Sequence, residues 1–99
     1  MFMIPKASQD APHITELVIK RSRFLTQTAH VASLNDGRLF VERIRQQNAS
    51  ATHNCWACVG AAAGDAGHMA CSDDGEPHGT AGKPMLQILA HSGLGEVCV

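Results

Sequence analysis

The stretch Ser72-Asp-Asp-Gly-Glu-Pro-His-Gly-Thr-Ala-Gly-Lys-Pro84 decides how this chain folds, because it joins two segments of different character. Before it, His68-Met-Ala-Cys71 is short and largely apolar, as is typical of a strand. After it, Pro84–His91 carries apolar residues at helical spacing, and a proline fits the first turn of a helix because that turn has no amide partner to lose. We therefore predict a loop between a strand and a helix.

The residues on either side predict further strands and one more helix. Predicted strands cover Ile14–Ile19, Phe24–Val31, Ala51–Ala63, His68–Cys71 and Leu94–Val99. The first two are predicted to form a hairpin. A helix is predicted over Arg38–Asn48, with Ser33 as a candidate N-cap and Asp36 three residues later in a capping-box-like position. We expect residues 1–12 to be a lead-in segment and residues 13–99 to form one domain.

Composition narrows the class of protein. The chain has 99 residues, 44% of them apolar and 17% charged, which suits one globular domain and is too apolar for a disordered chain. Its formal net charge is −1, so any affinity for phosphate must come from a local patch. The sequence contains no apolar run of about 18 residues, the length that would predict a membrane span, and no secretory signal is found. We therefore expect a cytoplasmic chain with no membrane partner and with reduced cysteines.

The glycine-rich loop is the first candidate site. The backbone of Gly79, Thr80, Ala81, Gly82 and Lys83 precedes a helix, where free amides and a positive dipole end favour a phosphate or carboxylate ligand. The candidate cation ligands Asp73, Asp74 and Glu76 form a weak metal set, because hard cations such as Mg²⁺ prefer oxygen ligands. The other interpretation is a tight surface turn with an N-cap at Thr80.

The segment His53-Asn-Cys-Trp-Ala-Cys58 is the second candidate site. Its Cys-x-x-Cys spacing is compatible with a zinc site, a redox site or two buried structural cysteines. If the segment is a strand, Cys55 and Cys58 point to opposite faces and one metal ion cannot take both. His53 shares a face with Cys55, so a histidine-assisted thiolate and a buried histidine without catalytic function both remain open.

The third candidate is the basic cluster Lys20-Arg-Ser-Arg23, at the predicted hairpin turn. Lys20, Arg21 and Arg23 suit contacts with nucleic-acid phosphates, and Phe24 offers a ring on which a base can stack. The alternative is a solvated loop without a ligand.

Four segments in order carry a resemblance to a known family. They are Lys20-Arg-Ser-Arg-Phe24, Ala51-Thr-His-Asn-Cys55, Ser72-Asp-Asp-Gly-Glu-Pro77 and Gly79-Thr-Ala-Gly-Lys-Pro-Met-Leu86. Together they resemble the amino-terminal domain of the IMPACT/YigZ family over about residues 14–99. The resemblance implies an α+β fold like the second domain of ribosomal protein S5, with a mixed or antiparallel sheet and two helices on one face. It also implies that relatives continue past Val99, so we expect a domain that is incomplete at its C-terminus.

The eukaryotic relatives regulate translation, and the resemblance therefore implies a translation-associated regulatory domain that binds RNA or the ribosome. The sequence proves no catalysis and implies no cofactor. The alternative is a metal-assisted hydrolase, or another enzyme acting on a phosphorylated or peptide-like small molecule. In that enzyme the candidate catalytic residues are His53 as general base and Asp73 or Asp74 as metal ligand. A further expectation is a protein partner, or self-association, through an open sheet edge near Val97–Val99.

Overall fold

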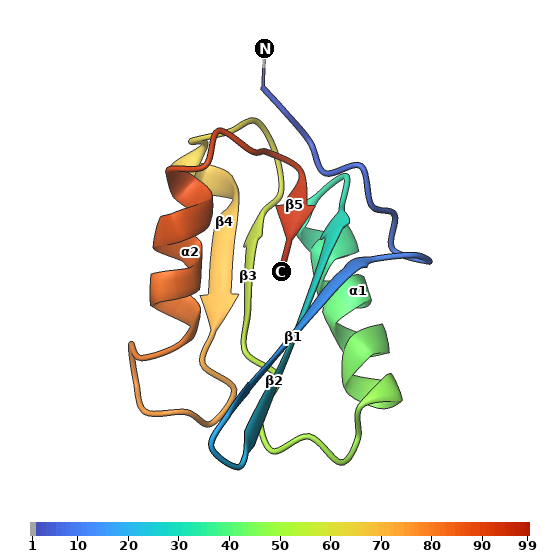
Figure 1. Cartoon of the computed structure of the whole chain (residues 1–99). Coiled ribbons are helices and arrows are strands. Elements are labelled where there is room, and N and C mark those ends of the chain that lie inside the picture. Colours follow the sequence, from blue (N-terminus) through green and yellow to red (C-terminus); the bar gives the residue numbers. More distant parts are fainter. Residues whose placement is uncertain (1) are drawn as a thin grey trace.

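The computed structural model describes residues 2–99, which form an α+β arrangement of one sheet and two α-helices (Figure 1). In chain order the elements are β1 (His13–Ile19), β2 (Ser22–His30), α1 (Leu34–Gln47), β3 (Trp56–Val59), a short 3-10 helix (Ala66–His68), β4 (Met69–Ser72), α2 (Gly82–Ala90) and β5 (Val97–Cys98). No helix within residues 2–99 is both long and apolar enough to cross a membrane. The predicted α+β class is confirmed.

The five strands have the order β1-β2-β5-β3-β4, and every neighbouring pair is antiparallel. The last strand in sequence therefore lies inside the sheet. Cys98 pairs with Ala29 of β2 on one side and with Cys58 of β3 on the other. The expected open edge at Val97–Val99 is wrong, because β5 has a hydrogen-bonded neighbour on both sides and the edges are β1 and β4.

Each helix packs on a different face of the sheet. Cys58 and Cys98 form one apolar cluster with Phe40 of α1, whereas Val59 and Val97 form another with Leu89 of α2. Successive side chains of a strand point to opposite faces, so these alternating residues place α1 and α2 on opposite sides. The expected arrangement of both helices on one face is therefore wrong.

Local signals set the helix ends. The Ser33 hydroxyl accepts a hydrogen bond from the Asp36 amide at 3.0 Å, which confirms the predicted N-cap, and Asn48 is the C-cap. Helix α1 begins at Leu34 rather than Arg38, because Ser33 caps the turn that contains Gly37. Strand β3 is much shorter than the predicted Ala51–Ala63.

Candidate functional site

The carboxylate of Asp73 closes the glycine-rich loop against the start of α2. Its Oδ2 accepts a hydrogen bond from the Gly79 amide at 2.8 Å, and its Oδ1 accepts from the Ala81 and Gly82 amides at 3.1 and 2.8 Å. These three hydrogen bonds hold the pKa of Asp73 below its ordinary value, and the bond from the Gly79 amide contributes most. Helix α2 has Ala81 at its N-cap and no side-chain cap of its own, so Asp73 serves that purpose from the end of β4.

The backbone amides predicted to bind an anion are therefore largely engaged. Those of Gly79, Ala81 and Gly82 donate to Asp73, and the amide and hydroxyl of Thr80 both donate to the Pro77 carbonyl, at 3.1 and 2.5 Å. The Thr80 hydroxyl does not cap α2. Lys83 is exposed in the first turn of α2. An anion at this place would have to displace the Asp73 carboxylate, and its binding stays a prediction.

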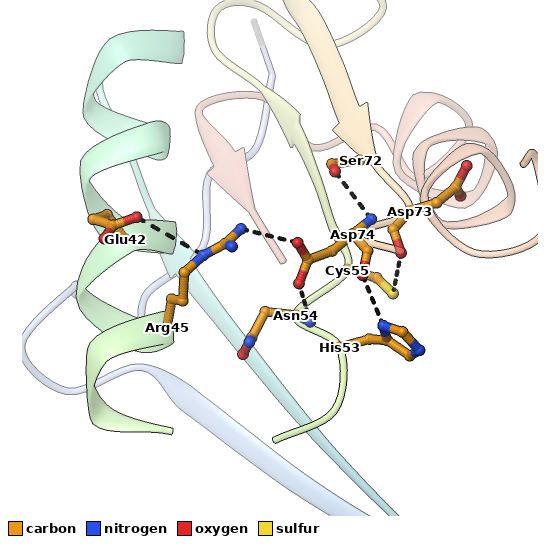
Figure 2. A network of polar contacts seen from close by, with 8 residues as sticks. All are labelled: Glu42, Arg45, His53, Asn54, Cys55, Ser72, Asp73 and Asp74. Carbon is orange, nitrogen blue, oxygen red and sulfur yellow. Dashed lines mark hydrogen bonds and ion pairs between the residues drawn. The ribbon is translucent and has the colours of Figure 1, made fainter. Parts of the chain in front are cut away.

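Asp74 turns the other way and connects three parts of the chain (Figure 2). Its Oδ2 accepts from the Asn54 amide at 2.6 Å, and its Oδ1 lies 3.2 Å from a guanidinium nitrogen of Arg45 on α1. Its own amide donates to the Ser72 hydroxyl at 3.1 Å. The backbone at Asp74 has a φ of 45°, in the left-handed region, which aims two consecutive carboxylates in different directions. Asp74 therefore ties α1 and the segment before β3 to the end of β4.

His53 and Cys55 both meet the backbone of this loop. His53 Nδ1 lies 2.7 Å from the Asp74 carbonyl oxygen, and its ring faces Gly75, where a Cβ would lie 3.1 Å from Nδ1. The Cys55 thiol donates to the Asp73 carbonyl at 3.2 Å. Burial first, and then the nearby carboxylates, raise the pKa of this thiol, which disfavours a reactive thiolate.

The candidate catalytic residues His53, Asp73 and Asp74 thus come together in space, but their polar atoms bind the backbone of the loop and of its neighbours. Within residues 2–99, no three His, Cys, Asp or Glu side chains are placed to hold one metal ion. This includes the predicted weak set with Glu76. Two hollows on the described surface lie elsewhere, one beside Pro5 and His13 and one between Ile14 and Arg43.

The basic cluster occupies the end of the β1–β2 hairpin, which Figure 1 shows as a long ribbon with its turn far from β5. Lys20 and Arg21 form the turn between the paired residues Ile19 and Ser22. Arg23 lies within β2, and its guanidinium meets the Glu16 carboxylate with two contacts of 3.1 Å on the exposed surface. The structure therefore gathers the predicted nucleic-acid contacts Lys20, Arg21 and Arg23 at one exposed place.

Next to this turn the structure adds two exposed apolar side chains to the candidate Phe24, which was chosen from the sequence. The register pairs Leu17 with Phe24 and places Ile19 on the same face. Leu17, Ile19 and Phe24 are 58%, 52% and 51% exposed, although such side chains usually lie against a core. The sequence signal that could have indicated this surface is the spacing of Leu17 and Ile19, which places both side chains on one face of a strand. The partnership of Arg45 with Asp74 had no comparable local signal.

Comparisons with known proteins agree with this architecture. The family model described as the Impact N-terminal domain matches residues 20–99. An IMPACT family member of Haemophilus influenzae is 44% identical over 96 residues, which cover 97% of this chain and 45% of the relative. The IMPACT family member YigZ of Escherichia coli is 48% identical over 79 residues, or 80% of this chain and 39% of the relative.

A solved structure described as that of a hypothetical protein superposes with a TM-score of 0.89 at 43% identity, covering 98% of this chain and 45% of the other. The chain thus spans less than half the length of each of these proteins.

Proposed function

The chain belongs to the IMPACT family, and from that premise we propose that it is a non-catalytic domain that binds RNA of the translation machinery in the cytoplasm. The observation that carries the proposal is the exposed β1–β2 hairpin, with cations at its turn and an aromatic ring beside them. The family resemblance supplies the connection with translation, and the hairpin supplies the chemistry.

The hairpin combines the two kinds of contact that single-stranded RNA needs. Lys20 and Arg21 sit on the turn, and no carboxylate of residues 2–99 forms an ion pair with either, so both can neutralise phosphates. Phe24 is about half exposed, and Leu17 and Ile19 extend its apolar face. Exposed aromatic rings on a sheet are platforms on which unpaired bases stack. The hairpin therefore offers backbone and base contacts on adjacent surfaces.

The glycine-rich loop is less suited to RNA than this hairpin. Its amides are satisfied by Asp73 and Pro77, and the carboxylates of Asp73, Asp74 and Glu76 repel a phosphate. Lys83 and Thr80 were the natural contacts if the loop bound RNA. A substitution of Lys83 therefore distinguishes RNA binding by this loop from RNA binding by the hairpin.

The test is a titration of the protein with fluorescently labelled single-stranded RNA across a series of salt concentrations. We expect the variant Lys20→Ala/Arg21→Ala to lower the affinity and to reduce the slope of log K against log salt by about 0.7 for each phosphate that the protein no longer neutralises. Phe24→Ala should weaken binding by about 1–3 kcal/mol with little change in that slope.

The matched control is Lys6→Ala/Lys83→Ala, which removes the same charge from other parts of the surface. It should bind RNA with the slope of the unchanged protein. Circular dichroism verifies that each variant is folded. Absence of binding at low salt, or equal losses of affinity in the hairpin and control variants, would contradict the proposal.

A further inference from the structure

Two cysteines face each other at the centre of the sheet. The amide of Ala57 donates to the Val99 carbonyl at 3.0 Å, and the amide of Val99 donates to the Ala57 carbonyl at 2.9 Å. Residues 57 and 99 are therefore a hydrogen-bonded pair of an antiparallel ladder. The next pair, Cys58 and Cys98, is then a non-hydrogen-bonded pair, in which the Cα atoms lie about 4.5 Å apart and the side chains approach closely.

Contacts with α1 show that the two sulfur atoms converge. A Cβ on Gly37 would lie 2.6 Å from Cys58 Sγ, and Cys98 Sγ lies 3.8 Å from the Gly37 carbonyl oxygen. Both side chains are fully buried. Only a glycine at this place in α1 leaves room for the sulfur of Cys58. The pair therefore has the Cα separation and the common direction that a disulfide needs.

The thiols are also unequal. The adjacent Cys98 side chain, together with the nearby Arg38, lowers the pKa of Cys58 against the effect of burial. The adjacent Cys58 side chain and burial raise the pKa of Cys98. Cys58 is thus the sulfur that carries the negative charge more readily, and the thiolate is the form that attacks an oxidant.

We propose that Cys58 and Cys98 are a reversible redox pair, which hydrogen peroxide or a similarly small hydroperoxide converts to a cross-strand disulfide. The Cys58 thiolate attacks one peroxide oxygen, the O–O bond breaks, and hydroxide leaves, so that Cys58 becomes a sulfenic acid. The Cys98 sulfur then attacks the Cys58 sulfur. The S–O bond breaks, the S–S bond forms, and the oxygen leaves as water with the proton of Cys98. The peroxide is reduced while the two thiols are oxidised.

The burial of Cys58 and Cys98 favours a small oxidant, and the positions of the other two cysteines favour a bond between Cys58 and Cys98. Because Cys58 and Cys98 are buried, a small oxidant reaches them more readily than a bulky disulfide does. Cys71 is exposed on the edge strand opposite Ala57, and Cys55 donates its hydrogen to Asp73. Neither has a cysteine opposite it in the sheet. The disulfide would bond β5 covalently to β3, where the ladder between the two strands is short.

The experiment uses the folded 99-residue chain carrying Cys55→Ser and Cys71→Ser, so that Cys58 and Cys98 are the remaining thiols. The protein is treated with hydrogen peroxide, unreacted thiols are blocked with N-ethylmaleimide under denaturing conditions, and the product is cut before aspartates without reduction. Cleavage before Asp74 separates the peptide with Cys58 from that with Cys98. Trypsin is unsuitable, since Lys83 is followed by Pro84 and no other Lys or Arg follows Arg45.

We expect a species in which these two peptides are joined, and which dithiothreitol separates. The midpoint of thermal unfolding should rise by about 10 °C on oxidation and return on reduction, because the cross-link closes a long loop. The variant that also carries Cys98→Ala should stop at the sulfenic acid of Cys58, detected with dimedone. In the unchanged protein, the same digest should yield the peptides that contain Cys58 and Cys98 joined by a disulfide. The peptide that contains Cys71 should not be joined to either of them.

The proposal is overturned if both thiols of the double-serine protein are labelled in full with maleimide after peroxide treatment. It is equally overturned if the unchanged protein links Cys71 in place of Cys98. In the unchanged protein Cys55 and Cys58 share the peptide of residues 36–64, so fragmentation of the linked peptide in the mass spectrometer assigns the bond to one of them. A link from Cys55 in place of Cys58 also overturns the proposal, and this measurement needs no substitution that could impair folding.

Discussion

Asp73 takes the place that an anionic ligand would take at the start of a helix. Three backbone amides point at its carboxylate, which is the environment that favours a charged rather than a protonated carboxyl group. The lowered pKa of Asp73 follows from these bonds. Its ionised form is therefore part of the folded structure of the loop.

We predict that Asp73→Asn makes the protein less stable at neutral pH and less sensitive to acid. A carboxyl group whose pKa is lowered by folding stabilises the protein above its unfolded pKa of about 3.9, and this stabilisation disappears as the pH falls through the lower folded value. Thermal unfolding from pH 7 to pH 2 should show a smaller acid-dependent fall for D73N than for the unchanged protein. Asp10→Asn, a charge-matched change on the surface, should keep the fall; equal curves for D73N and the unchanged protein would contradict the prediction.

The role of this residue was only partly predictable. The sequence placed three carboxylates beside a glycine-rich turn, but it did not distinguish a cation site from a set of backbone acceptors. The distinction depends on the left-handed backbone at Asp74, which sends Asp73 toward α2 and Asp74 toward Arg45. The relative direction of the two side chains depends on this conformation. Asp adopts it more readily than most residues do, but the sequence alone does not show which of the two aspartates will.

At the scale of elements, the Ser33 cap carries the clearest energetic expectation. Its hydroxyl satisfies the Asp36 amide, which otherwise lacks a partner within the helix. Ser33→Ala should therefore lower the free energy of unfolding by about 1 kcal/mol in urea denaturation. Ser50→Ala, in an exposed turn after α1, should leave the stability unchanged. Equal losses of stability for the two variants would show that the cap contributes nothing specific.

Elements with local signals were found from the sequence, whereas their arrangement was not. The hairpin, α1 and α2 follow from strand composition, helical spacing and the cap at Ser33. The insertion of β5 between β2 and β3, and the opposite faces of the helices, depend on contacts between distant residues such as Cys58 and Cys98. The apolar run Ala51–Ala63 overstated β3 because apolar loops and apolar strands share a composition.

For the whole molecule, burial predicts a gradient of stability. Every residue of β1 is exposed, whereas Ala57, Cys58 and Val59 of β3 are fully buried. Local opening should therefore free the β1 amides, while the β3 amides exchange only when the core opens. Native-state hydrogen exchange should show protection factors about 100-fold or more higher in β3 than in β1. Uniform protection across the two strands would contradict this expectation.

The interior position of β5 also bears on how the chain acquires its structure during synthesis. The ribosome makes the β1–β2 pair and then the β3–β4 pair before the strand that unites them. Until residues 97 and 98 leave the exit tunnel, the two hairpins have no shared ladder, and the apolar side chains on both faces of β3 stay partly uncovered. We therefore expect a nascent chain of this protein to expose more apolar surface during this interval than the complete sheet does, and such exposure favours aggregation.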